Sequence, residues 1–489
     1  MLHKQNKIKV PTWLIISIIV YIIIFFILLY IRQNTFQHNG SEGIMEDILL
    51  NSINGKFFYS NTFNQNFLGL HFSLIYILFF PMYYILKSYL LFFLIKSFFI
   101  SSGSIIIYKL SNKLELSEIK HLLTIIFLIS PIMWLLNFDD FFIIIVTIPL
   151  ILMTIYFLKE KKMSIFYLLL IILLVVEEET TLIIMMLGIY LFLKHEKKIG
   201  LKVFFIGIIG FILITNIIIP SFSNEEFFIY SDRFEYLGDN PVEIAKTIIQ
   251  KPLVILNIFL TKVDYIYTLL LGFLFLPLIS SFSIIAIPIF LINILSTNTE
   301  LLCLPFHYTS LIVVVFFIST LFGLKYLKQK FGSKIIKKIT YLLLVLNIII
   351  CFTTIFLLIN KEANLNQIPV INNYCYQKNL PSFNYEYLKE QNKNYHDLHK
   401  SISNMPLNTS VLGSHKLLPI LKQLEFDFLF PNAEFFTAEH IIIDKEENDL
   451  FYDSYPLTEL YEKIYNQNYE LVLKNKNYLI FKKIKEQTH

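Results

Sequence analysis

Charged residues, arginine and cysteine are all scarce in this chain of 489 residues. Charged side chains make up 16% of it, whereas a soluble globular protein has about 25%. The three cysteines show neither metal-site spacing nor a disulfide framework. The sequence contains no P-loop, no GxSxG elbow, no HExxH and no dinucleotide-binding fingerprint. A net charge of +4 gives no reason to expect a nucleic-acid partner.

What the chain has instead is a series of apolar stretches between Leu14 and Ile359, each suited to crossing a hydrocarbon core of roughly 30 Å. Five lysine clusters lie between them, and cytoplasmic loops carry an excess of lysine and arginine. We therefore predict a polytopic α-helical protein of the cell (plasma or inner) membrane, with about eleven transmembrane helices, the amino terminus inside and the carboxyl tail outside. The predicted spans are 11–32, 88–108, 121–137, 141–158, 163–176, 180–194, 201–219, 264–280, 283–297, 307–324 and 339–360.

The remaining connections are then extracytoplasmic, and two of them are long: the first outer loop, 33–71, and the outer loop 220–263. Segment 72–86 is short for a crossing and is predicted to be an interfacial helix. After the transmembrane domain, 1–361, the composition becomes polar, which predicts a small extracytoplasmic α/β domain over 362–489. Its predicted elements are strands at 410–412, 426–429 and 440–444, a helix at 457–466, and a hairpin of 469–473 with 477–482.

Adjacent acids in the first outer loop, Glu46 and Asp47, are the first candidates for chemistry. A carboxylate near a membrane surface acts as a general base toward a hydroxyl, or holds a divalent cation such as Mg²⁺ or Mn²⁺. A solvated loop helix is the alternative interpretation of the same pair.

Two further acidic turns, Asp139-Asp140 and Glu178-Glu179, lie between apolar runs. Charge at that depth is costly unless it is solvated or paired, so these residues are candidates for supporting the site or binding a metal. Acids ahead of a helix that starts at Thr180 also fit a purely structural role at the positive end of the helix dipole. Both roles stay open for Glu178 and Glu179.

The chain has two arginines, Arg32 and Arg233, and lysines supply the rest of its 41 basic residues. A guanidinium bonds phosphate in a fork that an ammonium cannot form, so Arg233 is the preferred contact for a lipid-linked phosphate. A loop salt bridge to Asp232 or Glu235 is its alternative. Arg32 is expected to be an interfacial anchor at the end of its helix.

The remaining candidates are Lys96, His71, His307 and Tyr308. Lys96 lies inside the second span, where an ionisable group is a functional candidate by default and snorkelling is the alternative. His71 ends the first outer loop, and His307-Tyr308 opens the tenth span. All four are candidates for binding a lipid-linked phosphate or another substrate. A lone histidine at such a place is also a common interfacial side chain.

Several stretches together resemble the family of predicted bacterial and archaeal membrane proteins called domain of unknown function 2079. They are His71-Phe72-Ser73, Pro81-Met82-Tyr83, the Asn137–Phe142 turn, the Glu178-Glu179 turn, Tyr236–Pro241, Phe275–Leu278, His307-Tyr308 and parts of the tail. That family is similar in architecture to membrane glycosyltransferases of the C-type fold, which use polyprenyl-phosphate-linked sugars. The resemblance implies a catalytic or metal-binding acid in the first outer loop, which Glu46 matches best, and a histidine after it, which His71 matches. Asp47 and Lys96 depart from the family's amide and glutamine.

The leading hypothesis is therefore an enzyme that transfers a sugar from a polyprenyl-phosphate carrier to a glycan, lipid or protein acceptor at the outer face of the bilayer. The alternatives are a transporter or flippase of lipid-linked glycans and a non-catalytic membrane scaffold. Transport predicts a polar path through the midplane and repeat symmetry. The sequence shows no repeat, and its polar groups gather on one side.

Overall fold

Long apolar helices dominate the computed structural model, which describes residues 9–35, 37, 40–223, 231–238, 241–360, 382–406, 409–413, 425–428, 438–444, 462, 464–474 and 478–484. A lipid-embedded backbone must satisfy its own hydrogen bonds, which helices do within one segment. Six helical segments of the described chain are long and apolar enough to cross a membrane: Thr12–Asn34, Leu90–Lys113, Lys120–Phe138, Lys197–Phe222, His307–Phe331 and Ser333–Ile359. The pair Pro252–Thr261 and Val263–Leu271, bent by 59°, makes a seventh if it is one span.

Shorter apolar helices cover Leu74–Leu86, Ile143–Lys159, Met163–Leu174, Thr180–Leu193 and Ser281–Leu295. Each predicted span falls on one of these long, bent or short segments, and the prediction of a multi-pass helical membrane protein is confirmed. The count of eleven crossings stays a prediction, because several of the helices are too short to cross unaided.

The helices of the first half are α1 (Thr12–Asn34), α2 (Ser41–Ile53), α3 (Phe80–Leu86), α4 (Leu90–Lys113), α5 (Lys120–Ile129), α6 (Pro131–Phe138), α7 (Thr147–Lys159), α8 (Met163–Leu174), α9 (Thr180–Leu193), α10 (Lys197–Leu213) and α11 (Ile219–Phe222). Those of the second half are α12 (Pro241–Gln250), α13 (Pro252–Thr261), α14 (Val263–Leu271), α15 (Ile287–Leu295), α16 (Ser310–Phe331), α17 (Ser333–Ile359) and α18 (Tyr385–Ser403). Single helical turns are η1 (Phe67–Gly69), η2 (Leu74–Phe79), η3 (Ile143–Val146), η4 (Ile214–Ile218), η5 (Ser231–Phe234), η6 (Leu276–Ile279), η7 (Ser281–Ala286), η8 (Thr299–Leu302) and η9 (His307–Thr309).

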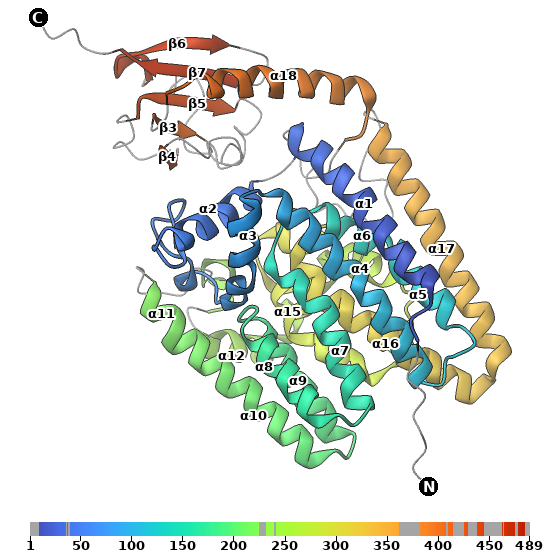
Figure 1. Ribbon diagram of the computed structural model, residues 1–489. Helices are drawn as coiled ribbons and strands as arrows, with labels where there is room; N and C mark the ends of the chain where they lie inside the picture. The colour runs from blue at the N-terminus through green and yellow to red at the C-terminus, as the bar shows by residue number, and fades with distance from the viewer. Residues whose placement is uncertain are drawn as a thin grey trace, which may run out of the picture.

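Three spans form the centre of the bundle. The spans that contain α16, α5 with α6, and α4 are 78%, 72% and 61% buried within the protein, whereas those of α1 and α10 are 28% and 22% buried. Helix α4 packs against α1, α5 and α7, and α16 packs against α7, α17 and the turns η6 and η7. Figure 1 shows α10 along one edge of the bundle and α17 along another. The peripheral helices therefore present their apolar side chains outward, as lipid-facing helices do.

Four of the five lysine clusters meet at one end of this bundle. Lys113 pairs with Glu160 at 2.8 Å, and Lys325 pairs with Glu115 at 3.0 Å. Lys159 is close enough to Lys325 and Lys194 that both help to lower its pKa, after burial, which lowers it most. The shared side that the sequence predicts for these clusters is therefore confirmed, and its identification as cytoplasmic stays a prediction.

Helix α9 packs closely on α10, and this packing fixes the position of the acidic turn that precedes α9. A Cβ at Gly188 would collide with the backbone of Phe204, and one at Gly200 would lie 2.5 Å from the backbone nitrogen of Phe192. Small residues allow membrane helices to approach this closely. Since α9 begins at Thr180 and ends beside the lysine cluster that starts at Lys194, the acidic turn lies at the opposite end of the bundle.

The polar tail contains α18 and a five-stranded sheet, both beyond one end of the bundle (Figure 1). The strands are β3 (Ser410–Gly413), β4 (Glu425–Phe428), β5 (His440–Asp444), β6 (Tyr469–Lys474) and β7 (Tyr478–Lys483), in the order β4-β3-β5-β7-β6. Strand β3 is parallel to β4 and β5, and the hairpin β6–β7 is antiparallel, as predicted. Helix α18 was not expected; its Leu398 and Ile402 pack with Val411, Ile442 and Ile480 of the sheet.

Much of the helix expected at 457–466 lies outside the described residues. The division at 361/362 and the extracytoplasmic position of the tail stay predictions. Two short strands, β1 (Tyr59–Ser60) and β2 (Gln65–Asn66), form a small antiparallel hairpin in the first outer loop.

The cysteines correct one expectation. Cys303 is disulfide-bonded, whereas three scattered cysteines predict no disulfide framework. Neither spacing nor composition reveals a single bridge. Cys351 is a buried free thiol. Disulfides persist in oxidising compartments, which fits the predicted outer position of the connection that carries Cys303.

Candidate functional site

A buried ion pair joins the end of α1 to the turn after α6. Arg32 Nη2 lies 2.7 Å from Asp140 Oδ1, and their side chains are 3% and 0% exposed. The second carboxylate oxygen of Asp140 accepts a hydrogen bond of 2.8 Å from the backbone N–H of Ser41, at the start of α2. The expectation that Arg32 is an interfacial anchor was wrong. Its guanidinium turns inward because a carboxylate 108 positions away supplies the counter-charge.

Lys96 belongs to the same network. It is fully buried in α4, and its ammonium donates to the backbone carbonyl of Asp139. Snorkelling is therefore not what the structure shows, since the ammonium points to an internal acceptor and not to the membrane surface. Lys96 and Arg32 together place two positive charges beside the two carboxylates of the Asp139-Asp140 turn. We call Arg32, Glu42, Lys96, Asp139, Asp140 and His307 the Asp140 network.

His307 is the partly exposed member of this network. Asp139 Oδ2 accepts a 2.9 Å hydrogen bond from the backbone N–H of His307 and lies 3.3 Å from its Nδ1. The ring also stacks on Phe142, with 3.4 Å between the ring centroids. A proton on Nδ1 satisfies the carboxylate and leaves Nε2 as the nitrogen that a ligand would meet. The side chain of His307 is 13% exposed, so it is the member that a substrate reaches most easily.

Glu42, on α2, is the member that the sequence analysis did not select. Its Oε1 accepts a 3.0 Å hydrogen bond from the backbone N–H of Phe141, and its Oε2 is buried without a hydrogen-bond partner. Burial and the nearby Asp140 raise the pKa of Glu42 to about 8, while Lys96 and Arg32 oppose the rise. A protonated Glu42 leaves two cations facing two carboxylates. The signal that could have found it is its spacing of four from Glu46, which puts both on one face of a helix.

Glu46 and Asp47, the predicted catalytic pair, point to different partners. Glu46 is 4% exposed, and its Oε1 accepts a 2.8 Å hydrogen bond from the hydroxyl of Tyr83. Asp47 accepts hydrogen bonds from the backbone N–H and the amide of Asn61 at 2.8 and 2.7 Å, and from the amide of Asn51 at 2.9 Å. These bonds hold the first outer loop closed on α2.

The expected divalent cation does not fit this arrangement. The donors on Asp47 are amides and N–H groups, which occupy the lone pairs that a metal ion needs. Within the part of the chain that the structure describes, no group of three or more His, Cys, Asp or Glu side chains is arranged to hold a metal ion.

A second cluster forms where the first outer loop meets the turn before α9. His71 Nδ1 lies 2.9 Å from Oε1 of Glu178 and 3.7 Å from Oε1 of Glu177. The backbone N–H of Phe72 donates to the other oxygen of Glu178 at 3.0 Å. Arg233, in η5, acts electrostatically on Glu179. His71, Glu177, Glu178, Glu179 and Arg233 are partly buried, and we call them the Glu178 cluster.

Electrostatics separate the three glutamates of this cluster. Burial favours a neutral Glu178, but His71 and the N–H of Phe72 outweigh it and lower the pKa. Burial and the neighbouring Glu178 raise the pKa of Glu179 to about 7, although His71 and Arg233 oppose the rise. Burial also raises the pKa of Glu177. The cluster thus holds one carboxylate that stays ionised and one poised to exchange a proton near neutral pH.

The structural alternative for this turn, acids at the positive end of the α9 dipole, stays open. Glu179 is the residue before α9, yet its side chain makes no capping hydrogen bond. The hydroxyls of Thr180 and Thr181 bond to the carbonyls of Glu177 and Glu178. The carboxylates of Glu177 and Glu178 are directed at His71.

An aromatic contact lies between the Asp140 network and the Glu178 cluster. Tyr76 is buried, and its ring centroid lies 6.4 Å from that of Phe141 and 6.3 Å from that of Phe67. Phe141 contacts Glu42 through its backbone, and Phe67 contacts His71 ring to ring at 5.9 Å. Sequence-distant candidates are thus brought together in two neighbouring groups, and not in one.

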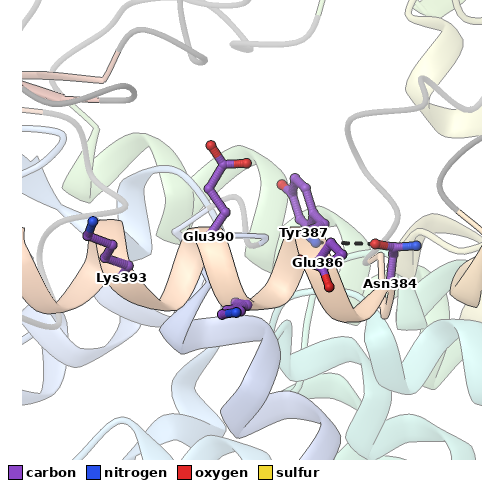
Figure 2. Close-up of a pocket in the computed structure, with 6 residues that line it drawn as sticks. Asn384, Glu386, Tyr387, Glu390 and Lys393 are labelled. Atoms are coloured by element: carbon purple, nitrogen blue, oxygen red, sulfur yellow. Dashed lines mark hydrogen bonds between the residues drawn. The ribbon is translucent and has the colours of Figure 1, made fainter.

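A hollow on the surface lies elsewhere, along α18 (Figure 2). It is lined by Asn384, Glu386, Tyr387, Lys389, Glu390 and Lys393. None of the residues expected from the sequence lines this hollow. Its single-helix lining of alternating charges is typical of a solvated face.

Comparison with known proteins places the chain in a family. The family model described as "Predicted membrane protein (DUF2079)" matches residues 41–480, so the chain belongs to that family. No curated protein and no solved structure matches the chain.

Proposed function

We propose that this member of the DUF2079 family is a membrane glycosyltransferase that uses a polyprenyl-phosphate-linked sugar at the outer face of the bilayer. The observation that carries the proposal is the Glu178 cluster. It joins an imidazole, an ionised carboxylate, a carboxylate with a pKa of about 7 and a guanidinium from three distant segments. The cluster is partly exposed, and it lies at the end of α9 opposite the lysine-rich turns.

In this proposal Glu179 is the general base. It takes the proton from an acceptor hydroxyl while the oxygen of that hydroxyl attacks the anomeric carbon of the donor. The bond from that carbon to the phosphate oxygen breaks, and the electron pair leaves with the polyprenyl phosphate. A base works best when its pKa lies near the operating pH, which favours Glu179 over the more deeply buried Glu46.

Arg233 and His71 would meet the phosphate. A phosphate leaving group needs its developing negative charge stabilised more than it needs a proton, and a guanidinium does this through paired hydrogen bonds. Glu178 holds His71 in position through its 2.9 Å contact. His307 and Tyr308, adjacent to the Asp140 network, are proposed to contact the sugar or the acceptor.

A transporter is the second candidate, because one observation favours it. The 59° bend between α13 and α14 is the kind of broken helix that transporters place at a substrate site. Liposomes that contain the purified protein separate the two functions. An enzyme releases polyprenyl phosphate from a labelled polyprenyl-phosphate sugar on one leaflet, whereas a flippase moves the intact lipid across without consuming it.

The decisive variants are Glu179→Gln and Glu46→Gln, assayed with a panel of polyprenyl-phosphate-linked hexoses and pentoses. We expect Glu179→Gln to lower release of polyprenyl phosphate by about a hundredfold or more, the usual contribution of a general base. Glu196→Gln, at an exposed glutamate near the lysine-rich end, is the matched control and should keep full activity. Loss of activity in Glu46→Gln with normal activity in Glu179→Gln would contradict this proposal and identify Glu46, in the first outer loop, as the general base.

A further inference from the structure

The outer loop after Arg233 leads into two short helices with bare apolar faces. In α13, Leu253, Leu256 and Leu260 are 79%, 54% and 63% exposed, and they follow the three-then-four spacing of one helix face. In α14, Val263 and Tyr267 are 57% and 52% exposed and lie four residues apart. We call these five residues the α13 stripe.

The opposite face of α13 packs on the bundle. The exposed stripe is therefore not the face with which α13 joins the hydrophobic core. The ring of Phe259 lies 6.0 Å from that of Phe290 in α15, between centroids, and Ile255 and Ile258 are partly buried against the same core. Ten residues of α-helix span about 15 Å, half of the hydrocarbon core of roughly 30 Å. Helix α13 is therefore long enough to cover the depth of one leaflet and too short to cross both.

The end of α15 fixes this stripe next to Arg233. Lys262, at the bend between α13 and α14, donates to the carbonyls of Ile294 and Ser296 at 2.5 and 2.9 Å. One residue further on, the backbone N–H of Thr297 donates to the carbonyl of Arg233 at 3.0 Å. The same four-residue segment, 294–297, thus holds both the turn that carries Arg233 and the bend in the middle of the stripe.

This placement matches one kind of amphiphile. A ligand whose anionic head meets Arg233 would have its tail emerge beside the bend and run along an apolar face that no other described helix covers. A branched, single-chain isoprenoid fits a narrow stripe one helix wide better than the paired chains of a diacyl lipid. Lys251 and Lys262 add positive charge at the two ends of α13.

We propose that the α13 stripe, with Arg233 at its head, is the binding surface for the isoprenoid chain of a polyprenyl phosphate. The proposal rests on the proposed function, since it names where the donor's lipid lies. It assigns α13 and α14 a role that the family description does not contain. It also gives the bend between α13 and α14 a purpose other than transport.

The test is photo-crosslinking of the full-length protein in liposomes with radiolabelled polyprenyl phosphate that carries no sugar. A photoreactive amino acid replaces Leu256 in the stripe, or Ile23 in α1, a control side chain of similar exposure at 53%. At Leu256 we expect saturable labelling that unlabelled polyprenyl phosphate competes away and phosphatidylglycerol does not. At Ile23 we expect weak labelling that rises without saturation.

Arg233→Ala should weaken labelling at Leu256 by about tenfold, which is the effect of losing one charge-assisted hydrogen bond of about 1.4 kcal/mol. Glu196→Gln should leave it unchanged, because this exposed glutamate lies at the lysine-rich end, away from Arg233. Equal, unsaturable labelling at both positions would mean bulk lipid only and would overturn the proposal. Saturable labelling at Leu256 with full transfer by Glu179→Gln would instead contradict the catalytic mechanism and leave the lipid site standing.

Discussion

Replacement of Glu42 by glutamine tests the electrostatics of the Asp140 network most directly. Glutamine has the shape of a neutral glutamic acid and keeps a carbonyl oxygen that accepts from the N–H of Phe141. It removes the ability to ionise. The structure assigns Glu42 the neutral form below a pKa of about 8, because burial and Asp140 outweigh Lys96 and Arg32.

The sign of the effect follows from linkage. The pKa of Glu42 rises from 4.5 in its ordinary state to about 8 in the fold, so the folded protein binds this proton more tightly than the unfolded chain does. The resulting stability is fully present below about pH 4.5 and is lost as the pH rises toward 8. With about 1.4 kcal/mol for each pKa unit, ionised Glu42 costs the folded state on the order of 5 kcal/mol at alkaline pH.

We therefore expect Glu42→Gln to change the free energy of unfolding by less than about 1 kcal/mol near pH 4.5, and to stabilise the protein by about 2 kcal/mol near pH 6 and by about 4–5 kcal/mol near pH 8.5. The measurement is unfolding of the purified protein in detergent across this pH range, as the difference between variant and wild type. Glu177 and Glu179 also have raised pKa values, so they too make the free energy of unfolding fall as the pH rises. Taking the difference between variant and wild type cancels their contributions. A variant that is strongly destabilised near pH 6 would refute the reasoning, because it would show Glu42 to be an ionised partner of Lys96 and Arg32.

Three further predictions follow from buried contacts. Asp140→Asn should destabilise the protein by about 3–5 kcal/mol, because it leaves the Arg32 guanidinium buried and unpaired, and thermal unfolding measures this; the double variant with Arg32→Met should recover most of the loss. Asp47→Ala should cost about 1–3 kcal/mol through unsatisfied N–H groups of the first outer loop, seen as faster proteolysis within that loop while α16 stays protected. Gly188→Leu should abolish folding or lower its yield sharply, because the backbones of α9 and α10 would have to separate, whereas leucine at the exposed Val345 of α17 should express normally.

How far the sequence predicts this structure depends on the range of the interaction. The long helices follow from apolar length alone, and the common end of the lysine clusters follows from the charge rule. Strand β5 falls exactly where alternation placed it, from His440 to Asp444. These features are local, so a window of a few to about twenty residues contains the cause.

The candidate site could not be predicted in the same way, because its contacts join distant segments. Nothing around Arg32 shows that Asp140 will neutralise it, and an arginine at a helix end has the same sequence signature when it faces the membrane surface. The sequence shows Glu42 and Glu46 alike as acids on one helix face. Only the packed structure shows that Glu42 lies beside the buried charges, whereas Glu46 accepts a hydrogen bond from Tyr83. The turn that carries Glu178 was identified, but its partner His71 was linked to it only by the structure.

The Asp140 network also explains why a membrane protein retains so many buried charges. Two cations and two carboxylates inside the bundle yield little net stability, because desolvation costs about as much as the pairing returns. Their geometric consequence is definite: Arg32 holds one carboxylate, Lys96 holds the carbonyl before it, and the turn then has a single arrangement. That arrangement points Asp139 at His307 and fixes which ring nitrogen faces outward. Charge burial here serves the orientation of one imidazole, and apolar replacements that preserved stability would not preserve that orientation.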